Sequence, residues 1–477
     1  MTTLIPKFKQ PATGAVNRPI NEKLNEIPSL SDFDTNANFQ TYALTLTQPV
    51  DHAVKPESVV RTLSSKLKDI ASILDFGGVA DGNSVTGTGT DNTAAFQLAI
   101  TTLGPSGSLY VPEGVYMIHS QVSVPSGFVI LGAGAYNSIL CAPNAFNSDG
   151  LFKFSGAGGP PTSIMHVGVL SQNGGCGPAS VGLNMAANGS YAENIWCGGF
   201  ATTVAIGSSS CFFYNSVIDT GVSAGTGLYI NAGAVIVANV QVYNNYTGVQ
   251  IASTNPTEPV TISNLQVIQC PYQGIVIDNA TNIHLDNCSC TSIPAAFSNG
   301  ALRIANSSKV NVSNFVGRLT TKNTSVVGIY ILDSSELNIS NSQLENWRYG
   351  IQCTGGSSVI INGNICSSNA EYGIAVAGGD RITISNNTCI ANGDTLSTTA
   401  GISTINNSGY AIYNVVGNIC SQNGGGVQNY GIKADIFNNG ADSGFTNLVG
   451  NIAKYNTTAN ISTTGVTANI SSTGNVV

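Results

Sequence analysis

The sequence predicts an all-β protein: a right-handed parallel β-helix of stacked coils, with short capping helices and an extended N-terminal arm. Three features predict it, namely a recurring glycine, a recurring asparagine and short β-branched runs between them. A period of 20 to 50 residues indicates stacked units that each bury their apolar side against the next unit. The glycines recur every 22 to 28 residues, at Gly274, Gly300, Gly328, Gly350, Gly373 and Gly401.

Each repeating unit has the content of a β-solenoid coil. Its apolar runs are short and β-branched, with Asn, Ser, Gly and Thr between them, which favours strands. The absence of a long apolar helical stripe excludes ankyrin, tetratricopeptide and HEAT repeats. An asparagine in register suits a tight left-handed corner and can bond to the same side chain one coil away. This row comprises Asn264, Asn287, Asn314, Asn341, Asn364, Asn387, Asn418 and Asn451.

The cysteines follow the same register. Cys366, Cys389 and Cys420 each lie two residues after an asparagine of the row, so we expect them to stack as small apolar core side chains. The 11 cysteines show no CxxC motif, and the first residues lack the apolar segment of a signal peptide. These features predict synthesis in a reducing cytoplasm without disulfides.

The chain divides into three predicted segments. Residues 1–57 are rich in proline and poor in apolar patterns, which predicts an extended arm that needs a partner to order it. Residues 58–104 are predicted to form a neck helix and the cap of the β-helix, and residues 105–477 the β-helix itself. The cap is an amphipathic helix over residues 91–103, with Asp91 or Asn92 as its N-cap.

The neck helix rests on apolar residues at spacings of three and four over residues 58–74. Two heptads suit either a short coiled-coil neck or a helix packed on its own domain. The spacing is carried by Val60, Leu63, Leu67, Ile70 and Leu74.

The composition narrows the classes of partner. Only 9% of the 477 residues are charged, and the formal net charge is −8. Without a basic tract, nucleic acid is excluded as an expected partner. No apolar run reaches the length of a membrane span, so no membrane insertion is expected. A surface rich in Asn, Ser and Thr suits neutral or hydroxyl-rich ligands.

Several motifs stand together near the start of the predicted β-helix. They are Asp75-Phe-Gly-Gly, Asp81-Gly, Asp91-Asn-Thr-Ala-Ala-Phe-Gln-Leu-Ala-Ile, Leu109-Tyr-Val-Pro-Glu-Gly-Val-Tyr and Ile130-Leu-Gly-Ala-Gly. This series resembles the opening of pectate-lyase-superfamily (pectin-lyase-like) β-helices, and of phage tailspikes in particular. The arm segment Thr13-Gly-Ala-Val-Asn-Arg-Pro-Ile-Asn-Glu is similar to N-termini of phage tail proteins.

The resemblance implies a homotrimer on a virion tail, attached to other tail proteins through residues 1–57. It further implies a tailspike that binds host surface polysaccharide and depolymerises it, as a glycoside hydrolase or a lyase. The alternative is a non-catalytic receptor-binding or structural tail fibre, and the sequence leaves enzymatic activity open. The resemblance carries no catalytic residues over to this chain. The chain departs from tailspikes that end in a separate trimerising or sugar-binding domain, because the weak repeat after residue 455 shows none.

The candidate site is therefore read from the residues themselves. Hydrolysis of a polysaccharide needs two carboxylates beside the scissile bond. Glu345, Glu371 and Asp394 precede successive row glycines, so we expect them on one face as the catalytic groups. Aromatic rings suit the apolar face of a sugar, and a guanidinium suits an anionic sugar. The expected substrate-binding residues are Trp347, Arg348, Tyr349 and Tyr372.

Two simpler interpretations remain open for this face. Arg348 and Glu371 each lie two residues before a row glycine, so they could form only a surface ion pair between coils. The face could also bind sugar without cleaving it. The four histidines are isolated in sequence, so no metal or other cofactor is predicted.

Overall fold

The computed structural model describes part of the chain. The described residues are 49–50, 61–62, 71–156, 159–172, 176–219, 225–291, 300–394, 398–406, 412–422, 427–436, 445–465 and 470–477. Contacts divide the chain into two units, Met1–Ala71 and Ser72–Val477. In the first unit, the described strands β1 (Pro49–Val50) and β2 (Arg61–Thr62) pair antiparallel.

The predicted neck helix is wrong at the residues of 58–71 that the structure describes. Arg61 and Thr62 lie in strand β2, and Ala71 begins strand β3 (Ala71–Ser72). An apolar spacing of only two heptads is a weak helical signal, and β-branched Thr62 suits a strand. Residues 58–60 and 63–70 of the neck, and the arm of residues 1–57 apart from β1, lie outside the described residues.

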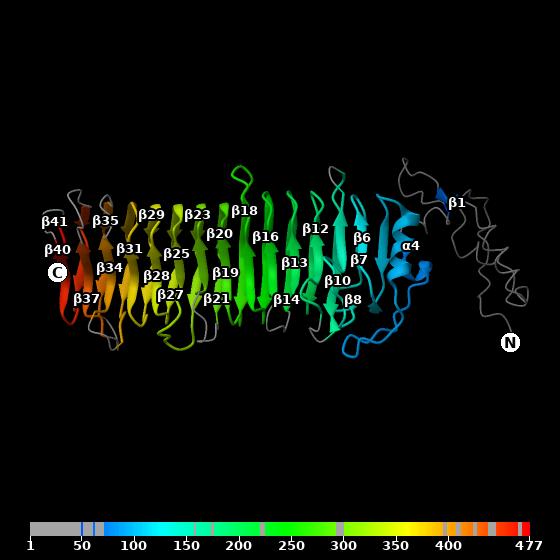
Figure 1. Cartoon of the computed structure of the whole chain (residues 1–477), viewed down its shortest axis with the longest axis horizontal. Coiled ribbons are helices and arrows are strands. Elements are labelled where there is room, and N and C mark those ends of the chain that lie inside the picture. Colours follow the sequence, from blue (N-terminus) through cyan, green and yellow to red (C-terminus); the bar gives the residue numbers. More distant parts are fainter. Residues whose placement is uncertain are drawn as a thin grey trace, which may run out of the picture. The chain divides into compact units, whose positions relative to one another are not determined.

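Residues 72–477 form a parallel β-helix, in which each coil pairs with the next (Figure 1). One face is a sheet of 14 described strands, which we call the flat sheet. Its strands are β6 (Val122–Pro125), β9 (Phe152–Ser155), β11 (Val181–Met185), β13 (Thr202–Ile206), β15 (Thr226–Ile230), β17 (Thr247–Ile251), β19 (Gln273–Asp278), β22 (Leu302–Ala305), β25 (Ile329–Leu332), β28 (Tyr349–Thr354), β31 (Tyr372–Ala377), β34 (Ala400–Asn406), β37 (Tyr430–Ile436) and β40 (Ala459–Gly465).

The other strands form a second sheet, which bends in the middle of each coil and which we call the bent sheet. Its first strands are β3, β4 (Ser108–Val111), β5 (Gly114–Met117), β7 (Val129–Gly132) and β8 (Ser138–Ala142). Long strands then run through the bend: β10 (Ser163–Ser171), β12 (Tyr191–Gly198), β14 (Phe212–Asp219), β16 (Val235–Tyr243) and β18 (Val260–Ile268).

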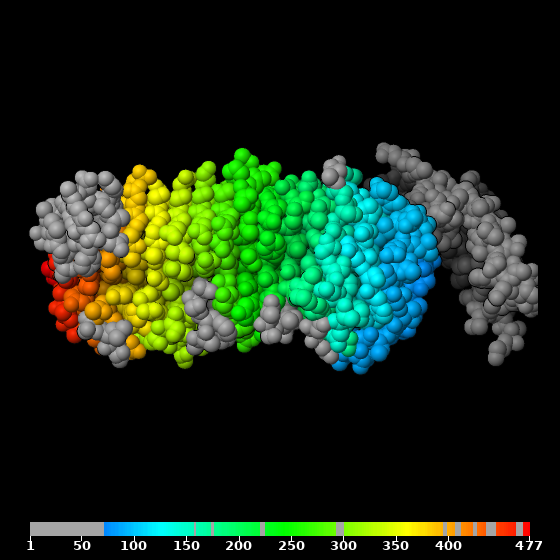
Figure 2. Space-filling model, viewed as in Figure 1, coloured from blue at the N-terminus to red at the C-terminus, as the bar shows by residue number. Residues whose placement is uncertain are grey.

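From there on, the bend divides each coil's part of the bent sheet into two shorter strands. These are β20 (Thr281–Asp286), β21 (Ser289–Thr291), β23 (Ser308–Ser313), β24 (Val316–Arg318), β26 (Ser335–Ser340), β27 (Gln343–Glu345), β29 (Ser357–Asn362), β30 (Ile365–Ser367), β32 (Arg381–Ser385), β33 (Thr388–Ile390), β35 (Ile412–Val416), β36 (Ile419–Ser421), β38 (Phe445–Val449), β39 (Ile452–Lys454) and β41 (Ile470–Thr473). Figure 2 shows the coils of this unit following one another in chain order as successive bands of colour.

The predicted glycine row is confirmed with one change. Gly328, Gly350, Gly373 and Gly401 precede strand residues that pair coil to coil. A Cβ on Gly373 would lie 2.6 Å from the carbonyl oxygen of Gly401, so this corner has no room for a side chain. Gly300 is one residue out of the row, because Ile275 pairs with Leu302. Its φ of +84° places it in the preceding corner instead.

The predicted asparagine row is two adjacent rows. Asn264, Asn287, Asn314 and Asn341 are outward corner residues with φ between 50° and 54°. The following four lie one position later, point inward and are fully buried: Asn364, Asn387, Asn418 and Asn451. Both positions favour asparagine, one for its left-handed backbone and one for its amide. Spacing in the sequence does not distinguish the two positions, so the sequence analysis predicted a single row.

The inward asparagines form a ladder. The side-chain oxygen of Asn387 accepts from the backbone and side-chain nitrogens of Asn364, at 2.9 and 3.0 Å. Its amide nitrogen donates to Ile361 and to Asn418. The corner backbone is thereby satisfied inside the protein, where an unpaired group would be costly.

Apolar side chains fill the rest of the interior in rows, one residue per coil. The inward-facing valine, leucine and isoleucine side chains of both sheets are almost all fully buried. Cys366, Cys389 and Cys420 pair in register and are buried, which confirms their predicted stacking. All 11 cysteines are free thiols. No described helix has both the length and the apolar character that crossing a membrane would need.

The capping helix is confirmed as α4 (Thr93–Leu103), which follows the 3-10 helix η2 (Ile73–Phe76). Phe96, Ala99 and Ile100 are buried against the first coils. Asn92 is the N-cap residue, but the cap contact comes from its neighbour Asp91.

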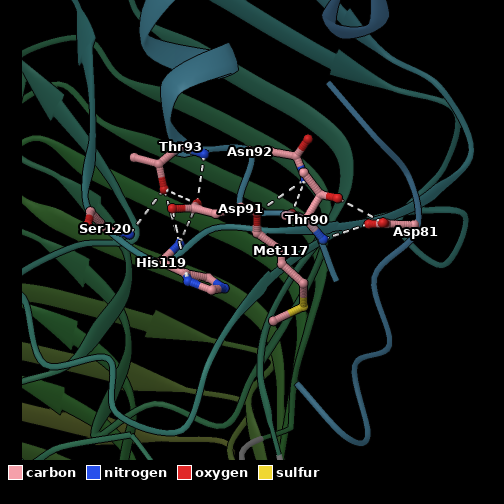
Figure 3. Close-up of polar contacts among 8 residues, drawn as sticks. All are labelled: Asp81, Thr90, Asp91, Asn92, Thr93, Met117, His119 and Ser120. Carbon is pink, nitrogen blue, oxygen red and sulfur yellow. Dashed lines mark hydrogen bonds and ion pairs between the residues drawn. The ribbon is translucent and has the colours of Figure 1, made fainter. Parts of the chain in front are cut away.

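Figure 3 shows how Asp91 joins the helix to the first coil. One carboxylate oxygen accepts from the backbone nitrogen and hydroxyl of Thr93, at 2.9 and 2.6 Å, and from the backbone nitrogen of His119 at 3.1 Å. Partial burial opposes ionisation, but these hydrogen bonds outweigh it and lower the pKa of Asp91. The ionised carboxylate thus holds the cap on the solenoid.

Replacing Asn387 with alanine should lower the free energy of unfolding. The change removes the acceptor of the buried Asn364 backbone nitrogen and a donor to the Ile361 carbonyl oxygen, and each buried group left unpaired costs about 1–3 kcal/mol. Asn386→Gly is the matched control, because Asn386 is an outward corner residue. Urea denaturation followed by circular dichroism measures both variants, and equal losses would contradict the ladder's role.

Candidate functional site

The predicted site residues come from the turns between the bent and flat sheets on three successive coils. Glu345 ends β27, and Tyr349 begins β28. Glu371 directly precedes β31, which begins at Tyr372. Asp394 follows β33 and is exposed. The coil register therefore brings the first two of these turns side by side, as expected.

Trp347 does not belong to the surface, and its predicted role in sugar contact is wrong. Its side chain is fully buried, and its indole nitrogen donates to the carbonyl oxygen of Gly317 at 2.9 Å. A row glycine, Gly328, leaves space for the ring in the core, since a Cβ there would lie 3.1 Å from it. A large apolar side chain beside an open position turns inward.

The other four residues of the two turns form one compact cluster. The guanidinium of Arg348 bonds to both carboxylate oxygens of Glu371, at 2.9 and 3.4 Å. The same guanidinium lies 4.7 Å from the ring centre of Tyr349. Tyr349 stacks on Tyr372 with ring centres 5.3 Å apart. We call these four residues the arginine–tyrosine cluster.

The ionisable groups of the cluster shift one another's pKa values. Burial raises the pKa of Tyr349 well above its usual range, and a hydrogen bond to Glu371 adds to the effect. The hydrogen bond to Glu371 also raises the pKa of Arg348. At neutral pH the cluster therefore presents a neutral phenol beside a fixed ion pair. Such a surface offers ring faces, a guanidinium edge and hydroxyl groups to a ligand.

The two remaining carboxylates are placed separately. Glu345 pairs with Arg318 on the preceding coil, with the Arg318 Nε and a Glu345 oxygen 2.6 Å apart. Asp394 lies beyond Gly393, whose carbonyl oxygen accepts from the Nζ of Lys322 at 3.3 Å. Glu345 and Glu371 are thus each held by an arginine, and their side chains are 33% and 14% exposed. The ion pair that the sequence left open is present.

The structure extends the cluster to residues that the sequence analysis did not select. Tyr430 lies in the same row as Tyr372, with Ala400 between them. Lys433 on the same strand forms an ion pair with Asp435 at 2.9 Å and lies 6.0 Å from the Tyr430 ring centre. Gly431 continues the glycine row one coil further, and this signal could have identified them.

In the described part of the chain, no group of three or more His, Cys, Asp or Glu side chains is arranged to hold a metal ion.

Comparisons with known proteins agree with the fold. Residues 273–442 match the family model for the right-handed β-helix region. Residues 70–167 match the model "Rhamnogalacturonase A/epimerase, pectate lyase-like". The predicted handedness, and the pectate-lyase-like character of the opening motifs, are thereby confirmed. A search of curated proteins finds no match.

Solved structures of low sequence identity share the architecture. Tailspike protein 3 of bacteriophage CBA120 is 15% identical, with a TM-score of 0.56 over 92% of this chain and 69% of that chain. The pre-mature gene product 12 of bacteriophage phi29 is 15% identical, with a TM-score of 0.52 over 80% of this chain and 67% of that chain. This protein therefore has the right-handed parallel β-helix fold with a pectate-lyase-like opening.

Trp347→Ala should destabilise the protein by about 3–5 kcal/mol, the usual cost of removing a large buried aromatic ring. Tyr372→Ala removes a partly exposed ring from the surface, so its cost should be much smaller. Chemical denaturation compares the two variants. The inward assignment of Trp347 fails if both variants lose the same stability.

Proposed function

We propose that this protein is a phage tailspike whose β-helix binds a host surface polysaccharide through the arginine–tyrosine cluster. The observation that carries the proposal is the contact of Arg348, Tyr349, Glu371 and Tyr372 on one surface of an otherwise charge-poor chain. The fold likeness to a phage tailspike supports it.

The chemistry of the cluster suits a sugar chain. Stacked phenol rings offer flat faces for pyranose rings, and their hydroxyl groups can bond to sugar hydroxyls. Arg348 is already oriented by Glu371 and Tyr349, so little side-chain entropy is lost when it binds an acidic or hydroxyl group. Lys433 lies further along the same face, which gives a sugar chain a second cation.

Cleavage of the polysaccharide is a second, finer proposal. Glu371 is favoured as its acid or base, because its side chain is only 14% exposed and lies among aromatic rings. Glu345 and Asp394 are the other candidate groups. Each glutamate is already bound by an arginine, an arrangement that suits binding without cleavage, as in a receptor-binding tail fibre. The experiment below separates the two proposals.

Assembly as a homotrimer on the virion tail, attached to other tail proteins through residues 1–57, belongs to the same proposal. Exposed isoleucines in one outward row of the bent sheet support association with further copies. Ile365, Ile419 and Ile452 align in this row, with Thr388 between the first two, and are 39–44% exposed. Apolar side chains in a row on a polar surface commonly mark an interface.

Arg348→Ala and Tyr372→Ala should each weaken binding of the host polysaccharide by tenfold or more, as measured by affinity electrophoresis. Thr383→Ala, on the bent-sheet strand β32 and outside the flat sheet that carries the cluster, is the control and should bind like the wild type. Unchanged binding in both cluster variants would contradict the site.

If the protein cleaves the chain, Glu371→Gln or Glu345→Gln should lower the release of reducing ends by roughly 10²–10⁴-fold, because a general acid or base is lost. Wild-type rates in both variants would remove these residues from catalysis. No release of reducing ends by the wild type would favour the non-catalytic tail fibre.

Sedimentation of the full chain at micromolar concentration should give the mass of a trimer. Ile419→Asp should shift the protein towards the monomer, because it places a charge in the apolar row. Thr388→Asp places a charge in the same row without removing an apolar side chain, so it should shift the protein towards the monomer less strongly. A wild-type monomer under these conditions would contradict the assembly.

A further inference from the structure

A groove runs along the outside of the bent sheet, far along the chain from the arginine–tyrosine cluster. It lies where strands β14, β16 and β18 bend, and its cavity volume is about 360 Å³. The bend comes from a left-handed asparagine in the middle of each strand. The lining residues are Asn215, Ser216, Val217, Asn239, Gln241, Asn264 and Gln266.

The side-chain amides of the groove are fixed in place by one another. The Nδ2 of Asn239 donates to Asn215, and that of Asn264 donates to Asn239, at 3.0 and 2.9 Å. Beside this row, the Nε2 of Gln241 donates to Gln266 at 3.2 Å. An amide has two N–H donors and two acceptor lone pairs. The asparagine ladder uses one of each, so each amide can still donate one hydrogen bond and accept another.

The wall of the groove continues into aromatic residues. Trp196 occupies the same outward row as Val217 and Gln241, one and two coils earlier. Its ring lies against Tyr136, with ring centres 4.9 Å apart, and Tyr136 is 63% exposed. A ring platform in line with a row of fixed amides combines the two contacts that a sugar ring makes, through its apolar face and its hydroxyls.

The charges around the groove select the kind of ligand. None of its seven lining residues is charged. The nearest carboxylate in the ladder is Glu193, whose Oε1 accepts from Asn215 at 2.8 Å. Hydrogen bonds from Tyr191 and then Asn215 lower the pKa of Glu193, so it is ionised at neutral pH. A negative charge at one end and no cation in the lining disfavour an anionic chain.

We propose that this groove is a second binding site, which takes a neutral, hydroxyl-rich glycan chain lying along the β-helix axis. The proposal rests on the proposed function for its ligand class, but it concerns a separate surface. Amides that repeat once per coil, roughly 4.8 Å apart, meet a ligand whose hydroxyl groups also repeat. Bulk water also hydrogen-bonds to glycan hydroxyl groups, so the fixed amides must compete with it for them.

The two tryptophans give the groove its own signal. Trp347 is buried, whereas Trp196 is partly exposed beside the groove. A glycan in the groove should protect Trp196 from quenching by acrylamide, whereas a glycan at the arginine–tyrosine cluster should not. The probes are linear neutral hexasaccharides (glucan, galactan and mannan) and a linear hexauronate.

The double variant Gln241→Ala/Gln266→Ala is compared with the wild type, using whichever neutral hexasaccharide the wild type binds. It should weaken that binding by tenfold or more and abolish the protection of Trp196. Val217→Arg places a much larger side chain in the groove. It should therefore also weaken binding and abolish the protection of Trp196. Gln343→Ala is the matched control, because Gln343 belongs to the same outward row beyond the groove and does not line it. It should behave like the wild type.

Each outcome bears on one proposal or the other. Groove variants that bind like the wild type overturn the groove. So does a wild type that binds only the hexauronate and loses it in Arg348→Ala, although the proposed function then stands. Loss of neutral binding in the groove variants but not in Arg348→Ala supports a separate site. A wild type that binds none of the four probes and no host polysaccharide overturns both proposals.

Discussion

The parallel stacking of one coil directly on the next is the constraint on which the rest of this structure depends. At the row glycines, the backbone of one coil lies so close to the next coil that no Cβ fits between them. This contact fixes both the distance between neighbouring coils and their register. A shift of one residue would exchange the inner and outer faces of a strand. Every row in the molecule, whether apolar, amide or aromatic, is a consequence of that fixed register.

Much of the fold could be predicted from the sequence, because the residues that set the register recur at regular intervals along it. Glycine marks the position where no Cβ fits, and the cysteines and β-branched residues mark the inward rows. The capping helix was also predictable, since Phe96 and Ile100 lie on one face. The prediction was wrong where two adjacent positions favour the same residue for different reasons. Asn341 and Asn364 look alike in sequence, yet one has a left-handed backbone at the surface and the other bonds inside the core.

The site was harder to predict than the fold, because a turn does not alternate inward and outward as a strand does. Trp347 and Arg348 are neighbours in one turn, but only the arginine faces solvent. Neither composition nor spacing distinguishes them; the space beside Gly328 does. The groove at the bend was missed for another reason. Five of its seven lining residues are ordinary amides spread over three coils, and they line a cavity only once the strands bend.

The coils are not all of the same length, although their rows match. Along the buried amide ladder, successive asparagines are 23, 31 and 33 residues apart. The additional residues lie between the described strands in sequence, so insertions there leave the geometry of the ladder unchanged. The segment between β33 and β34, next to the arginine–tyrosine cluster, can therefore change in length and sequence while the core stays the same. In evolutionary terms, ligand preference and structural stability are separable in this protein and can vary at different rates.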